Sequence, residues 1–118
     1  MLRQNRNHRI LKEIGYQREA VLEYAKQWAK GRNPRYLDFE HMGGDCTNFA
    51  SQCIYAGSGV MNYTPTMGWY YSSGSNRSPS WTGVVYLYNF LTGNKSAGPY
   101  GVETNEKGVE PGDIVQLE

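Results

Sequence analysis

The feature that most constrains the fold is a long, almost uncharged segment in the middle of the chain. Between Cys46 and Asn94 the only charged residue is Arg77. The same segment contains ten aromatic residues, and aromatic side chains bury large apolar areas in protein cores. A segment of this composition is too aromatic for a disordered chain. We therefore expect the chain to form a folded, globular domain.

Length and charge narrow the class of protein further. The 118 residues are enough for one domain, and 12 basic against 11 acidic residues leave a formal charge of +1. Nine of the basic residues lie within residues 1–36, apart from the aromatic segment, whereas nucleic-acid-binding arms interleave the two kinds. No apolar run approaches the roughly 20 residues of a membrane helix, and no signal peptide follows the basic start. We expect neither nucleic acid nor membrane as a partner, and the sequence assigns no location.

The counts of cysteine and histidine limit the chemistry. The chain has two cysteines and two histidines. Two cysteines are too few for a disulfide scaffold, and this set of residues does not favour a zinc site. We expect no metal ion and no other cofactor. A thiol or a polar side chain must then carry any reaction.

The chain begins with a predicted basic leader, residues 1–12, followed by a domain over residues 13–118. From residue 13 to residue 30, apolar side chains recur with the spacing of an amphipathic helix. Lys30 suits the negative end of that helix dipole, and Gly31 ends the helix.

The second half of the domain is predicted to contain a loop, a helix and the first strand of a sheet. Residues 58–79 are rich in small and polar residues and predict a long structured loop. A helix follows from residue 78 to residue 94, and a strand is predicted over residues 114–117. Because such a strand has an unpaired edge, we expect the chain either to pair with a second copy as a homodimer or to be prone to aggregation. The predicted buried face of the helix consists of Trp81, Val84, Val85, Tyr88 and Leu91.

The helix predicted to begin at Cys46 is the centre of the functional argument. Gly43 and Gly44 supply conformational freedom, and Asp45 is a suitable N-cap residue. Gly57 begins the segment that ends the helix. The predicted buried stripe consists of Cys46, Phe49, Ala50, Cys53, Ile54 and Gly57.

Cys46 is the candidate nucleophile. At a helix N-terminus, unsatisfied N–H groups and the helix dipole favour the thiolate, and they also stabilise an oxyanion. The alternative is that Cys46 is a small core residue, because free cysteine is among the most buried residue types. Cys53, seven residues along the helix, is predicted to be a core residue and too distant for a disulfide with Cys46. The two histidines of the chain, His8 and His41, are poorly placed to act as the catalytic base for Cys46.

The run from Gly43 to Cys53, Gly-Gly-Asp-Cys-Thr-Asn-Phe-Ala-Ser-Gln-Cys, closely resembles the motif of the amidase domain family, a branch of the papain-like cysteine hydrolases related to NlpC/P60 and CHAP domains. The resemblance extends over roughly residues 14–118. Its further segments are Tyr16–Ala29, Arg32-Asn33-Pro34-Arg35-Tyr36, Gly68-Trp69-Tyr70-Tyr71, Ser78-Pro79-Ser80-Trp81 and Pro111-Gly112-Asp113-Ile114-Val115-Gln116.

The resemblance implies an α+β, papain-like fold with a helical N-terminal half, the nucleophile at a helix N-terminus and the start of an antiparallel sheet. It implies a Cys46 thioester and cell-wall peptide of a Gram-positive bacterium as the substrate. In the family, the histidine lies on the strand after the one that residues 111–117 would begin. The chain ends before that strand, so we expect the N-terminal portion of the domain, which alone does not cleave amides. The alternative is that a second polypeptide supplies a catalytic residue.

Five other residues are candidates for the site, each with an alternative. Asp45 either caps the helix or positions the substrate or the base. Asn48 and Gln52 either donate hydrogen bonds to a substrate amide or tie the helix to loops. Trp69 and Trp81 either form the wall of a groove for a glycopeptide or pack in the core. If the chain is not an enzyme, we expect a glycan- or peptide-binding module, or an assembly domain, of papain-like shape.

Overall fold

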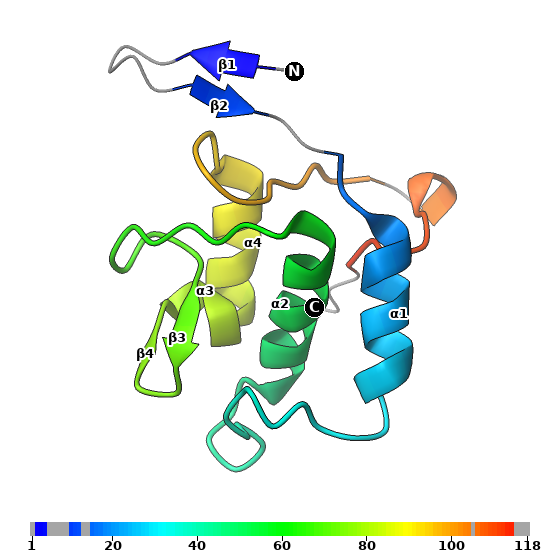
Figure 1. Ribbon diagram of the computed structural model, residues 1–118, viewed down its shortest axis with the longest axis vertical. Helices are drawn as coiled ribbons and strands as arrows, with labels where there is room; N and C mark the ends of the chain where they lie inside the picture. The colour runs from blue at the N-terminus through cyan, green and yellow to red at the C-terminus, as the bar shows by residue number, and fades with distance from the viewer. Residues whose placement is uncertain (1, 5–9, 13–14, 105, 115–118) are drawn as a thin grey trace.

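A computed structural model of the chain describes residues 2–4, 10–12, 15–104 and 106–114. The described part is α+β: helices make up its body, with two separate pairs of short antiparallel strands (Figure 1). No helix in these ranges is long and apolar enough to span a membrane. The elements in chain order are β1 (Leu2–Gln4), β2 (Ile10–Lys12), α1 (Arg18–Trp28), α2 (Asp45–Ser58), β3 (Tyr71–Ser73), β4 (Asn76–Arg77), α3 (Pro79–Thr82), α4 (Val84–Gly93) and the 3-10 turn η1 (Glu106–Gly108).

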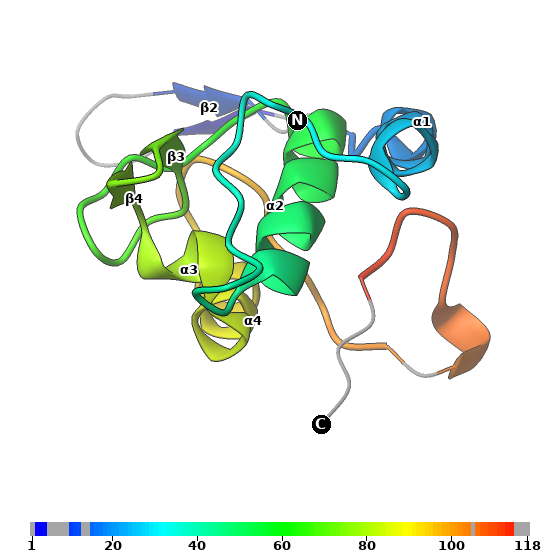
Figure 2. The same cartoon turned by 90° about the horizontal axis from the view of Figure 1, so that it is seen from below.

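Helix α2 is the central element. It lies between α1 on one side and α3 with α4 on the other (Figure 2). Gly57 permits the close approach to α1, because a Cβ atom at this position would lie 2.4 Å from a Val21 methyl group and 2.7 Å from the Tyr16 ring. Gly59, in the left-handed conformation, ends α2 as the sequence predicts.

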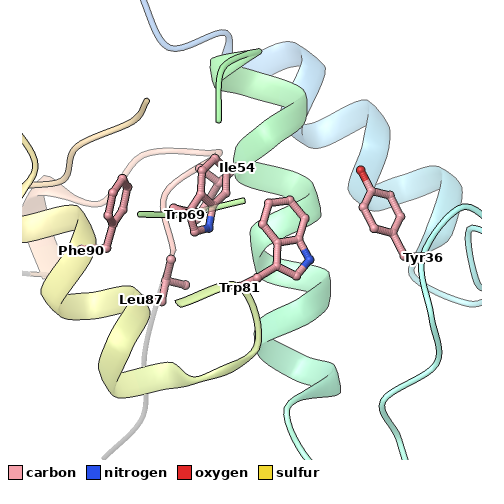
Figure 3. Close-up of a cluster of buried hydrophobic side chains, with 6 residues drawn as sticks. All are labelled: Tyr36, Ile54, Trp69, Trp81, Leu87 and Phe90. Atoms are coloured by element: carbon pink, nitrogen blue, oxygen red, sulfur yellow. The ribbon is translucent and has the colours of Figure 1, made fainter. Parts of the chain in front are cut away.

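The core lies on the α4 side of α2. It is built around two fully buried tryptophans, whose ring centroids are 4.9 Å apart (Figure 3). Tyr36 comes from the connection between α1 and α2 and stacks on Trp81 at 5.9 Å. Most of these core side chains come from the uncharged segment between Cys46 and Asn94. The buried cluster consists of Tyr36, Ile54, Trp69, Trp81, Leu87 and Phe90.

The predicted buried face of the last helix is wrong in most positions. The structure has two helices there, because Gly83 is extended (φ −111°, ψ 120°) and interrupts the helical turn. The interruption changes the phase, so α4 buries Leu87 and Phe90. The side chains of Val84, Val85 and Tyr88 are exposed.

The start of the chain also differs from the prediction. The segment expected to be a leader contains β1 and β2, which pair with Leu2 opposite Lys12. Helix α1 begins at Arg18 rather than at residue 13, because the Gln17 N–H donates to the Gly57 carbonyl at 2.9 Å and ties the chain to the end of α2. The predicted strand 114–117 lies outside the described residues except for Ile114, so the homodimer remains a prediction.

Candidate active site

Cys46 is the second residue of α2 and is exposed. The turn before it needs glycine, because Gly43 and Gly44 have φ of 80° and 88°. The Gly44 carbonyl accepts the first helical hydrogen bond, from the Asn48 N–H at 2.8 Å. The backbone N–H groups of Cys46 and Thr47 precede this bond and so have no acceptor within the helix.

The same turn is packed against the end of α3. A Cβ atom on Gly44 would lie 2.4 Å from the Thr82 carbonyl oxygen, so a larger residue cannot replace this glycine without a shift of the backbone. Nearby, the Arg77 side chain donates to the Thr82 hydroxyl at 3.2 Å and covers the Phe39 ring at 4.3 Å. The end of α2 that carries the thiol is therefore fixed by tertiary contacts.

The predicted N-cap role of Asp45 is wrong. Gly44 is the N-cap residue, and no side chain caps the helix. The Asp45 carboxylate is instead engaged by Arg32, through two hydrogen bonds of 2.9 and 3.1 Å, and by the Phe39 N–H at 3.2 Å. The hydrogen bonds from Arg32, with those from Asn48 and Phe39, lower the pKa of Asp45 against the opposing effect of partial burial. Asp45 thus joins α2 to the connection that precedes it.

Asn48 is enclosed in the core, 1% exposed. Its Nδ2 donates to the Leu37 carbonyl and to Asp45 Oδ1, both at 3.3 Å. Its Oδ1 accepts the Trp81 indole N–H at 3.0 Å. Both ends of the carboxamide are used within the fold, so the structure places Asn48 as a tie between helix and loop, not as a donor to a substrate.

Gln52 differs from Asn48 in one respect. Its side chain is buried, and its Oε1 accepts a hydrogen bond from the Tyr24 hydroxyl of α1. That hydroxyl in turn accepts from Asn33 Nδ2 at 3.2 Å. Within the described ranges, no acceptor is bonded to Gln52 Nε2, which leaves its N–H groups available.

Trp69 and Trp81 have no exposed surface. No face of either ring is open to a ligand, which contradicts the groove alternative and leaves core packing. Their indole N–H groups donate to Ser51 Oγ and Asn48 Oδ1, at 3.1 and 3.0 Å. This need for buried acceptors explains why the predicted apolar stripe of α2 is wrong in part. Beside Cys53, Ile54 and Gly57, the helix buries Thr47, Asn48, Ser51 and Gln52.

The two cysteines lie in opposite environments. Both are free, as predicted, but Cys46 is exposed and Cys53 is buried. Burial raises the pKa of the Cys53 thiol to about 11. Of the two histidines, His41 is exposed in the loop before α2 and His8 lies outside the described residues. No hydrogen bond joins His41 to Cys46 among the contacts of the described part of the chain.

Three residues beside the site were not foreseen. Arg32, Asn33 and Tyr24 connect the end of α1 to the first turns of α2. A signal for Arg32 existed in the sequence, because it precedes two acids of the same short connection, Asp38 and Glu40, and pairs with them at 3.2 and 3.7 Å. The partners of Tyr24 carry no such signal.

Between the end of α1 and the first turns of α2 lies a cavity of about 190 Å³. Cys46 does not line this cavity, but Asp45, the residue before it, and Phe49, one turn after it, do. The described ranges contain no group of three or more potential metal-ligating side chains. The cavity is lined by Trp28, Ala29, Gly31, Arg32, Asn33, Asp45, Asn48, Phe49 and Gln52.

Comparison with known proteins identifies the family. Residues 15–118 match the family described as "Putative amidase domain". The chain belongs to this family. The uncharacterized protein YhbB of Bacillus subtilis (strain 168) is 34% identical to it over 103 residues, which are 85% of this chain and 32% of that protein. This chain thus spans about a third of the length of that relative. No solved structure matches this chain significantly.

Proposed function

We propose that this amidase domain uses Cys46 as the nucleophile of a cysteine-dependent hydrolase. The observation that carries the proposal is the contrast within one helix: Cys46 is exposed at the N-terminus of α2, whereas Cys53 is buried with its pKa raised to about 11. Membership of the amidase domain family supports hydrolysis of an amide bond. The turn of Gly43 and Gly44 packs against Thr82, and Cys46 beside it is exposed.

The reaction follows from this placement. As the Cys46 thiol loses its proton to a base, the sulfur bonds to the carbonyl carbon of the substrate, and the oxyanion accepts the backbone N–H of Cys46. The C–N bond then breaks, and the amine leaves with the proton that the base held. Water hydrolyses the resulting thioester, which releases the carboxylic acid and restores the thiol.

The acid–base group is proposed to lie outside the described residues. His41 is exposed and has no bond to the thiol in the described ranges, and the resemblance places the family's histidine on a strand following residues 111–117. We also propose, from the same resemblance, a papain-like fold related to NlpC/P60 domains and cell-wall peptide as the substrate. The α+β helical body with the thiol at a helix N-terminus is compatible with that fold.

The binding-module alternative has lost its main support. It depended on Trp69 and Trp81 as an open aromatic wall, and both side chains are enclosed. An exposed thiol at a helix end has no part in such a module. The hydrolase is therefore the function that the geometry favours.

A pair of substrates with the same acyl group tests the chemistry. With a p-nitrophenyl ester, the leaving group needs no proton, so we expect a burst of about one p-nitrophenolate per chain. With the matching p-nitroanilide, the amine must leave with a proton. The rate should therefore be lower by about the 10²–10⁴-fold that general acid–base catalysis contributes. The burst should vanish in Cys46→Ser and persist in Cys53→Ser. A burst that survives Cys46→Ser would overturn the proposal.

The substrate class is tested separately by protection. Soluble cell-wall peptides should slow the alkylation of Cys46 by iodoacetamide, because they occupy the surface beside the thiol. The cell-wall disaccharide without its peptide should not slow it. If the disaccharide protects as well as the peptide does, the peptide substrate is wrong.

A further inference from the structure

The cavity beside Cys46 has no role in the proposed reaction, yet it has the chemistry of a binding site. We propose that it receives the side chain of the substrate residue whose carbonyl carbon Cys46 attacks, and that it selects an uncharged side chain ending in a hydrogen-bond acceptor, such as a carboxamide. This inference rests on the proposed function, since it assigns specificity to the same site.

The first support is the position of the cavity. Asp45 is bonded to Cys46 in the chain, and Phe49, three residues after Cys46, is its neighbour on the helix surface. Both line the cavity. A substrate bonded to the sulfur therefore has the cavity within the reach of one side chain.

The second support is an unused donor. Gln52 is 6% exposed and lines the cavity. Its Oε1 is occupied by the Tyr24 hydroxyl, which orients the carboxamide. Its Nε2 has no hydrogen-bond acceptor within the described ranges. Because solvent reaches Nε2 in the free protein, a ligand that enters the cavity and covers this donor must supply an acceptor, or the N–H is left unpaired at a cost.

The charges around the cavity exclude an ionic ligand. Arg32 faces Asp45 at 2.9 Å, Asp38 at 3.2 Å and Glu40 at 3.7 Å, so a carboxylate ligand would meet three competing anions. The Asp45 carboxylate is already bonded to Arg32, to the Phe39 N–H and to Asn48, so an ammonium ligand finds no free anion there.

The size and walls of the cavity fit one side chain. Its volume of about 190 Å³ is below the roughly 300–1,000 Å³ of pockets that hold drug-sized ligands. The rings of Trp28 and Phe49 supply apolar surface for the methylene groups of a side chain. The polar end would then reach Gln52.

Peptidyl chloromethyl ketones provide the test, because the Cys46 sulfur bonds to the methylene carbon as chloride leaves and the thiol proton passes to the buffer. N-acetyl derivatives of glutamine, glutamate and lysine share this reaction and differ in the side chain. The glutamine probe should alkylate Cys46 about tenfold faster than either charged probe, which corresponds to one satisfied hydrogen bond. Equal rates for the three probes would overturn the inference.

Two substitutions make the test specific. Gly31 lines the cavity, and a Cβ atom there meets nothing within 4 Å. We therefore expect the side chain of Gly31→Leu to occupy part of the cavity. We expect it to slow the glutamine probe about tenfold and to leave iodoacetamide, which needs no cavity, unaffected. Gly15→Leu is the matched control, because Gly15 is equally open and lies outside the cavity wall.

Gln52→Glu provides an independent test in case the Gly31→Leu variant does not fold. It keeps an oxygen for the Tyr24 hydroxyl and removes the N–H donor, so the preference should change from the glutamine probe to the lysine probe. An unchanged preference would overturn the inference. Failure of iodoacetamide to label Cys46 in the wild-type chain would instead overturn the proposed function, so the two failures are distinguishable.

Discussion

Two serines on α2, Ser51 and Ser58, differ in the hydrogen bonding of their hydroxyl groups. Ser51 Oγ donates to the Trp81 carbonyl at 2.9 Å and accepts the Trp69 indole N–H at 3.1 Å. Ser58 Oγ is buried and has no partner in the described part of the chain. The first hydroxyl connects two segments of the core. The second makes no such connection.

This contrast gives a matched pair of substitutions. Ser51→Ala leaves the Trp69 N–H without its acceptor and should lower the free energy of unfolding by about 1–3 kcal/mol. Ser58→Ala removes an unpaired hydroxyl and gains helix propensity, so its effect should lie between zero and a gain of about 1 kcal/mol. Urea unfolding of both variants checks the order. A larger loss for Ser58→Ala would contradict these contacts.

The two thiols should differ strongly in reactivity. Iodoacetamide at pH 7 should alkylate Cys46 in the folded protein and leave Cys53 unmodified, because burial both shields Cys53 and raises the pKa of its thiol to about 11. In urea, where the burial is lost, the two should react at similar rates. Peptide mapping by mass spectrometry separates them, and equal labelling of the folded protein would contradict the assignment.

Sequence reasoning reached Cys46 but not its neighbours. The glycines before Cys46 and the periodicity after it are local signals, so the position of the thiol at a helix start could be predicted. The role of Asn48 could not, because the indole that it binds belongs to Trp81, 33 residues away in the chain. The role of Asp45 was predicted wrongly for the same reason, because its partner Arg32 lies in a different segment of the chain.

At the scale of elements, the contact between α1 and α2 depends on one glycine. The Cβ of a residue at position 57 would meet the Val21 methyl at 2.4 Å and the Tyr16 ring at 2.7 Å. Neither neighbour moves freely: valine is stiff at its branched carbon, and the Tyr16 hydroxyl donates to the Gly112 carbonyl at 2.9 Å.

Gly57→Ala should therefore lower the free energy of unfolding by about 1–3 kcal/mol, as overpacking does, despite the better helix propensity of alanine. Gly93→Ala is the control, because Gly93 also lies in a helix and a Cβ atom there meets nothing within 4 Å. We expect it to be neutral or slightly stabilising. Thermal unfolding of the two variants checks the difference, and equal stabilities would contradict the close helix contact.

The success of element prediction depended on local stop signals. Helix α2 ends where glycine follows it, and its bounds are close to those predicted. The face of α4 was wrong because Gly83 was treated as helical, and one extended residue shifts every later residue around the helix. The strand pair β3–β4 lay within the segment predicted to be a loop, where alternation of apolar residues is absent.

At the scale of the whole molecule, two arginine–aspartate pairs fasten distant segments. Arg32 binds Asp45, and Arg18 of α1 binds Asp113 at 2.6 Å, which holds the described end of the chain against α1. The Arg32 hydrogen bonds lower the pKa of Asp45. The Glu110 N–H, with Arg18, lowers the pKa of Asp113.

The sign of the pH dependence follows from these shifts. Because both pKa values are lower in the folded state than the unfolded value of about 3.9, the pairs stabilise the fold fully above that pH. The stabilisation is lost as the pH falls through the folded pKa values. We expect the midpoint of urea unfolding to be nearly constant from neutral pH to about pH 5 and to fall below about pH 4. Asp45→Asn with Asp113→Asn should flatten this decline, and an unaltered decline would contradict the pairing.

The central claim is that Cys46 forms a covalent acyl intermediate. The most direct measurement is the mass of the intact protein after brief exposure to an activated acyl ester, followed by mapping of the modified peptide. The account predicts one added acyl group on Cys46, removed by hydroxylamine as a thioester is, absent in Cys46→Ser and present in Cys53→Ser. An acyl group found on Cys53 or on a lysine, with Cys46 unmodified, would contradict it.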